Sequence, residues 1–106
     1  MISILVVLPE GNPLDELAGR NPSVEVLTAH RMDDTLEKLG RNRRIDAVLF
    51  LGGREVPEIV AAVMDDNPAH PPLFIPAGHS AVPGTRPLAA TAPLALLDLL
   101  VRTLET

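Results

Sequence analysis

Short apolar runs alternate with amphipathic segments along the whole chain. Three runs are almost entirely apolar and are predicted to be strands: Ile2–Leu8, Asp46–Leu51 and Leu73–Ala77. Such runs are typical of strands that are buried on both faces of a parallel sheet. Val24–Ala29 alternates more strongly, which predicts an outer strand, and a short fifth strand is expected at Leu88–Ala90.

Amphipathic segments follow most of these runs and predict helices. We expect a helix of about two turns from Pro13 to Gly19, and further helices over Asp33–Gly40, from Val56 to before Asn67, and from Pro93 onward. Between the fourth and fifth strands, Pro83, Gly84 and Pro87 disfavour a full helix. Strand, loop and helix in repetition predict an α/β fold with a mostly parallel sheet, in one domain over residues 1–106.

Composition removes several classes of function. The net charge of −5 disfavours a general binder of nucleic acid or anionic membranes. The chain has no cysteine, which excludes disulfides, thiolate catalysis and cysteine-ligated metals. It has no long apolar stretch and no basic segment before the first strand, so neither a transmembrane helix nor a signal peptide is expected, and the expected location is the cytoplasm.

The order of elements resembles the receiver domain of bacterial response regulators. Gly53-Arg54-Glu55-Val56-Pro57 stands where receivers have Asp-x-x-Met-Pro after the third strand. Ala92-Pro93, followed by leucines, stands where receivers have Lys-Pro before their last helix. The resemblance implies a three-layer sandwich around a five-stranded sheet of flavodoxin-like order 2-1-3-4-5, with the fourth helix short or absent, and a place in two-component signalling.

The positions that carry the family's chemistry hold other residues. Gly53 stands in place of the phosphoacceptor Asp, and Ala92 in place of the Lys. Pro76 or Ala77 stands in place of the Ser/Thr, and Leu8-Pro9, followed by Glu10, in place of the acidic pair. Phosphoryl transfer to Asp needs a carboxylate nucleophile, a hard cation held by carboxylates, and positive charge for the transition state. The resemblance therefore implies a degenerate receiver that is not phosphorylated and is not an enzyme.

The loops after strands one, three and four are the candidate ligand site. In a 2-1-3-4-5 sheet these loops surround the switch point between strands one and three. They carry Glu10, Gly52, Gly53, Glu55, His79 and Ser80. Two readings stay open: a small-ligand or anion site, or solvated loop residues beside a tight glycine turn. No metal site and no cofactor are expected, because neither a zinc spacing nor a nucleotide motif is present.

The last helix carries more leucines than one buried stripe needs. Leu94, Leu97, Val101 and Leu104, with Leu100 beside them, fit a single stripe against the sheet. Leu96 and Leu99 are then expected to project away from the core. The predicted interface for a protein partner or a homodimer is therefore Leu96, Leu99 and Leu100, and scattered exposed leucines are the alternative.

Two functions of different classes follow. The first is a non-enzymatic signalling or interaction module that is receiver-like but not phosphorylated. The alternative is a flavodoxin-like domain that binds a small ligand or an anion with the loops after strands one, three and four. An enzyme ranks third, because the chain lacks Cys, Tyr, Trp and any familiar catalytic set.

Overall fold

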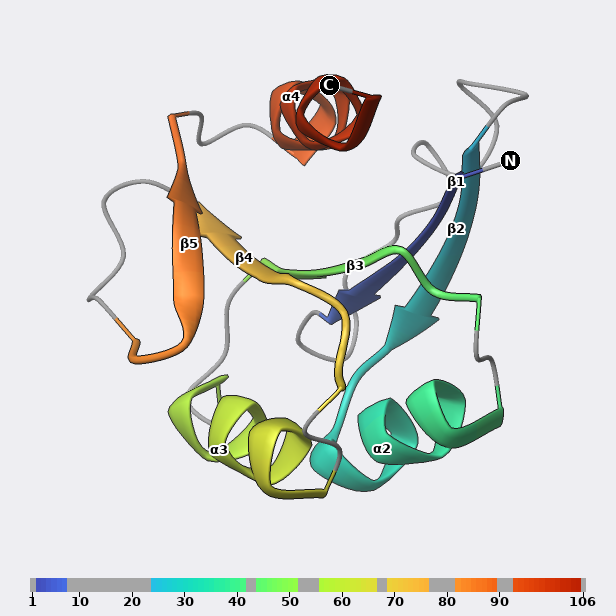
Figure 1. The fold of residues 1–106 in the computed structure, drawn as a ribbon, viewed down its shortest axis with the longest axis vertical. Helices are drawn as coiled ribbons and strands as arrows, with labels where there is room; N and C mark the ends of the chain where they lie inside the picture. The colour runs from blue at the N-terminus through green and yellow to red at the C-terminus, as the bar shows by residue number, and fades with distance from the viewer. Residues whose placement is uncertain are drawn as a thin grey trace.

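The computed structural model describes residues 2–7, 24–41, 44–51, 56–66, 69–76, 82–89 and 93–105. Within them, five parallel strands form one sheet in the order β2-β1-β3-β4-β5 (Figure 1). The strands are β1 (Ile2–Val7), β2 (Val24–Ala29), β3 (Ala47–Phe50), β4 (Leu73–Pro76) and β5 (Thr85–Leu88). The helices are α2 (Met32–Arg41), α3 (Val56–Asp66) and α4 (Pro93–Glu105). The α/β class and the order 2-1-3-4-5 are confirmed, and the helix expected over 13–19 lies outside the described residues.

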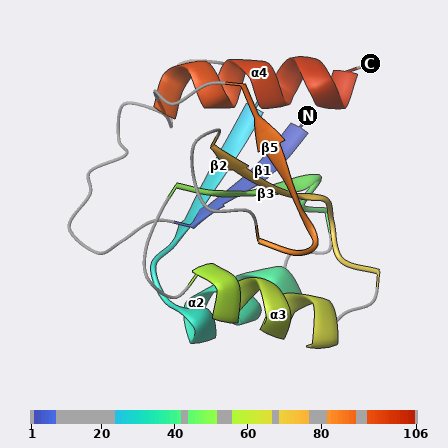
Figure 2. The same cartoon turned by 90° about the vertical axis from the view of Figure 1, so that its left-hand side faces the viewer.

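The sheet is covered on both faces, which explains its apolar strands. Helix α4 lies on one face, while α2 and α3 lie side by side on the other (Figures 1 and 2). In β1, Ile4 and Val6 pack into the core beneath α4, whereas Leu5 and Val7 pack into the core beneath α2 and α3. All four side chains are buried, so neither face of β1 is polar from Ile4 to Val7.

The amino end of the sheet is fixed by a reciprocal pair of hydrogen bonds. The Ser3 amide donates to Oδ2 of Asp46 at 2.8 Å, and the Asp46 amide donates to the Ser3 carbonyl at 2.8 Å. These bonds set the start of β3 against β1. The register then aligns Val7 with both Ala29 and Phe50, so β1, β2 and β3 end at the same edge.

Strand β5 lies three residues earlier than the sequence predicts. It was expected at Leu88–Ala90, but it spans Thr85–Leu88. The chain turns at Gly84, with φ of 91°, and the Thr85 amide and hydroxyl both donate to the Val82 carbonyl. The strand begins directly after this turn. Because β5 is an edge strand, Pro87 is tolerated there without its N–H.

The connection between β4 and β5 is short. Its described residues, 82–84, form a turn and no helix, and residues 77–81 lie outside the described part. Eight residues join two neighbouring parallel strands, fewer than the dozen or so that a crossover through a helix needs.

The leucines of α4 face the sheet more broadly than expected. Leu96 and Leu100 are fully buried beside Leu97 and Val101, and Leu99 and Leu104 are half-buried against the same core. The expectation that Leu96 projects away from the core is therefore wrong. Among the described residues, α4 is the only helix on this face, so a wide apolar arc is needed to cover strands β1 to β5. Among the side chains of α4 that the structure describes, the exposed ones are Ala95, Asp98, Arg102 and Thr103.

Candidate functional site

The predicted ligand loops start from one edge of the sheet. Val7, Ala29 and Phe50 are level in the register, and β4 runs parallel beside β3. The Leu51 amide donates to the Val7 carbonyl at 2.8 Å, which extends the pairing of β1 and β3 by one residue. The proposed ligand residues themselves lie outside the described part of the chain: Glu10, Gly52, Gly53, Glu55, His79 and Ser80.

The carboxyl end of β3 lacks an acid. β3 ends at Phe50, and no Asp or Glu occurs in the sequence between Asp46 and Glu55. Asp46 lies at the opposite, amino end of the strand, where its carboxylate accepts from the Ser3 amide. Asp46 therefore stands at the wrong end of the sheet to replace a phosphoacceptor.

The chain has a single lysine, and it lies on α2. Nζ of Lys38 donates to the Thr28 carbonyl and lies 3.8 Å from Oδ1 of Asp34. Asp34 in turn accepts from the His30 amide at 3.2 Å. This lysine holds the end of β2 to the first turns of α2, and no lysine follows β5 in the sequence.

Other chemistry is sparse in the described residues. They contain no group of three or more His, Cys, Asp or Glu side chains placed to hold a metal ion. Nδ1 of His70 lies 2.7 Å from the Pro71 carbonyl, at the amino end of β4 and away from His30. None of the helices described is long and apolar enough to cross a membrane.

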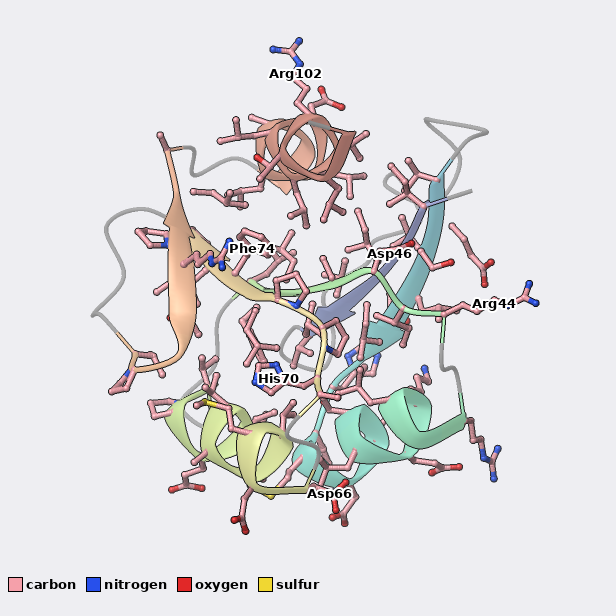
Figure 3. The ribbon with its side chains drawn as sticks, in the orientation of Figure 1. Arg44, Asp46, Asp66, His70, Phe74 and Arg102 are labelled. Carbon is pink, nitrogen blue, oxygen red and sulfur yellow. The ribbon has the colours of Figure 1, made fainter. Side chains whose placement is uncertain are left out.

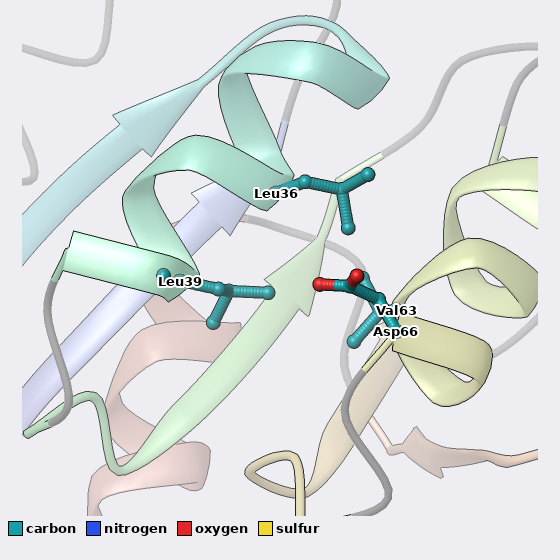
Figure 4. Close-up of a pocket in the computed structure, with 5 residues that line it drawn as sticks. Leu36, Leu39, Val63 and Asp66 are labelled. Carbon is teal, nitrogen blue, oxygen red and sulfur yellow. The ribbon is translucent and has the colours of Figure 1, made fainter.

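A pocket between α2 and α3 is a feature that the sequence did not predict. This α2–α3 pocket has a volume of about 170 Å³ and is lined by Leu36, Leu39, Gly40, Val63 and Asp66 (Figure 4). Val63 is buried, the two leucines are half-buried, and Asp66 is exposed. The sequence signals only the charge of Asp66, an acid in the last turn of a helix, where acids are unfavourable.

The predicted interface on the last helix is largely internal. Leu96 and Leu100 are each 0% exposed and belong to the core, so neither is available to a partner in this conformation. Leu99 keeps part of its side chain accessible. The side chain of Leu94 lies outside those that the structure describes.

Comparisons with known proteins give the fold. No family model matches the chain, and no curated protein matches its sequence. A chain in the crystal structure of the phosphorylated P1 domain of CheA3 in complex with CheY6 from R. sphaeroides is similar in structure, with a TM-score of 0.70 and 16% sequence identity. The match covers 97% of this chain and 95% of that chain. This similarity supports the α/β architecture of the whole chain.

Proposed function

We propose that this chain is a non-enzymatic signalling or interaction module of receiver-like fold that is not phosphorylated. The observation that carries the proposal is the residue sequence at the carboxyl end of β3. Phe50 ends the strand and Leu51-Gly52-Gly53-Arg54 follows, so Gly53 stands where a receiver has its phosphoacceptor Asp. Glycine has no side chain to accept a phosphoryl group.

The described contacts of Asp46 and Lys38 also support this proposal. Asp46 is bonded at the other end of the sheet, and Lys38 is bonded within α2 and to β2. Phosphoryl transfer needs a nucleophile and positive charge at one place, so neither residue supplies what the carboxyl edge lacks.

A protein partner is the second half of the proposal. The structure that contains the similar chain is a complex of two proteins, the P1 domain of CheA3 and CheY6. This supports a protein as the partner of the present chain. The acidic balance and the absence of nucleic-acid motifs favour a protein over nucleic acid as partner. We place this module in the cytoplasm.

Incubation with acetyl phosphate and Mg²⁺, followed by intact-mass measurement, tests the first half. A receiver that retains its Asp serves as the positive control in the same buffer. We expect the control to gain one phosphoryl group and this chain to keep its mass. A stoichiometric phosphoryl adduct on this chain would overturn the proposal.

The alternative is an anion or small-ligand site at the carboxyl edge. It is favoured by the register that brings the ends of β1, β2 and β3 level, next to the Gly52-Gly53 pair in sequence. Titration with inorganic phosphate, followed by amide NMR, separates the two functions. Saturable shifts confined to Leu51 and its sequence neighbours would favour the ligand site.

A further inference from the structure

The α2–α3 pocket has the size of one side chain. At about 170 Å³ it is smaller than the roughly 300–1,000 Å³ of pockets that enclose a drug-sized ligand. Leu36, Leu39 and Gly40 of α2 form one wall, and Val63 and Asp66 of α3 form the other. The pocket opens between α2 and α3 (Figure 4). These two helices cover the face of the sheet opposite α4 (Figure 1).

A carboxylate is directed into this apolar pocket. Asp66 points from the end of α3 toward the space between Leu36 and Leu39 (Figure 4). No ion pair of Asp66 occurs among the described residues. Among the described cations of α2 and the residues after it, Nη2 of Arg41 lies 3.0 Å from Oε1 of Glu37, and Arg44 extends outward, away from the helices (Figure 3).

The charge at the end of α3 is unfavourable in the free protein. The last turn of α3 holds Asp65 and Asp66 and no basic residue, at the negative end of the helix dipole. Helix α2 is arranged the other way, with Asp33 and Asp34 in its first turn and two basic residues in its last. Proteins break such local rules of stability at functional sites, and a cation at this end of α3 would relieve the unfavourable charge.

We propose that the α2–α3 pocket binds an arginine side chain of a partner protein. The aliphatic stem lies against Leu36, Leu39 and Val63, and the guanidinium pairs with the carboxylate of Asp66. Arginine fits better than lysine because its planar, weakly hydrated head pairs with carboxylates in a bidentate way. This inference rests on the proposed interaction role and deepens it by naming the chemistry of the partner.

A partner protein fits better than a free amine. The pocket is open, and exposed residues adjoin its lining in the sequence, among them Glu37 beside Leu36 and Arg41 beside Gly40. A small cation would gain few contacts there against its loss of freedom on binding. A polypeptide that carries the arginine would also contact these flanking residues.

The test uses the ¹⁵N-labelled full chain and the pentapeptide acetyl-Ala-Ala-Arg-Ala-Ala-amide, followed by amide NMR. We expect saturable shifts centred on the five residues that line the pocket. The same peptide with citrulline, a neutral isostere of arginine, should bind about two- to fivefold more weakly, the range of an exposed ion pair. Asp66→Asn should weaken the arginine peptide by the same factor.

Asp65→Asn is the matched control, because Asp65 lies in the same helix turn but does not line the pocket. It should weaken binding of the arginine peptide clearly less than Asp66→Asn does. Equal binding of the citrulline peptide, equal binding by the Asp66→Asn variant, or shifts that spread over all acidic residues would each overturn the proposal. If butylguanidinium binds as tightly as the peptide, the ligand is a free cation and the partner-protein inference is wrong. Phosphorylation is measured separately by intact mass, so failure of the arginine peptide to bind does not affect the test of the proposed function.

Discussion

Gly84→Ala and Gly40→Ala are the same chemical change, and we expect them to shift the free energy of unfolding in opposite directions. Gly84 has φ of 91°, a backbone conformation that residues other than glycine rarely adopt. Holding alanine in such a left-handed conformation costs roughly 1–2 kcal/mol. The lower entropy of the unfolded alanine chain offsets about 0.4–1 kcal/mol of that cost.

Contact with Met64 adds little to the cost at Gly84. A Cβ at Gly84 would overlap Sδ of Met64 and lie 3.0 Å from its Cε. Both atoms belong to the far end of a flexible side chain that is 40% exposed, so the thioether can rotate into solvent. We expect a net destabilisation of about 1 kcal/mol, which lowers Tm by roughly 4 °C in a domain of this size.

At Gly40 the balance has the other sign. Gly40 lies in α2, and a Cβ added there meets no heavy atom within 4 Å apart from its chain neighbours and the backbone of its own helix. Alanine is favoured over glycine in a helix interior by about 0.8–1.0 kcal/mol. Because Gly40 is the last residue but one of α2, we expect about half of that, a stabilisation of about 0.5 kcal/mol.

Urea unfolding followed by far-ultraviolet circular dichroism measures both changes, since the chain has neither Trp nor Tyr for fluorescence. The midpoint should fall for Gly84→Ala and rise for Gly40→Ala, with the same slope in urea. Repeating Gly84→Ala in a Met64→Ala background separates the two causes. A Gly84→Ala variant as stable as the parent chain would refute the backbone argument, and a penalty that vanishes with Met64→Ala would assign the cost to the side-chain contact.

Three further predictions use the same unfolding assay. Leu96→Ala should lower the free energy of unfolding by about 2–5 kcal/mol, as for a buried leucine. Leu99→Ala, at a half-buried leucine, should lower it by clearly less, and equal effects would contradict the packing of α4. Asp46→Ala removes the acceptor of the Ser3 amide and should cost about 1 kcal/mol, whereas Asp46→Asn, which keeps an acceptor oxygen, should cost less. Asp65→Asn and Asp66→Asn should each stabilise the free chain by about 0.3–1 kcal/mol at low salt, and the gain should shrink in high salt.

The central strands and the helix boundaries were predictable because burial and proline leave strong local signals. β1 and β3 are buried on both faces, so their residues are apolar without alternation. Helices α3 and α4 begin within one residue of Pro57 and Pro93, where the missing N–H costs nothing. These features depend only on neighbouring residues in the sequence and on a sheet that helices cover on both faces.

The errors came from features that depend on tertiary packing. β5 is a short edge strand with the polar residues Thr85 and Arg86, so its sequence is typical of a loop. Its position depends on the turn at Gly84 and on pairing with β4. The burial of Leu96 depends on how much of the sheet α4 must cover. The α2–α3 pocket depends on the distance between two helices that are separated by β3 in sequence.

The most direct test of the central claim uses a protein phosphodonor. A domain that carries phosphohistidine is mixed with this chain and Mg²⁺, and the intact masses of both proteins are followed over time, with an Asp-containing receiver run in parallel. We expect the donor to lose its phosphoryl group no faster than it does alone, and this chain to stay unmodified. Transfer of one phosphoryl group to this chain at a rate near that of the receiver would contradict this expectation.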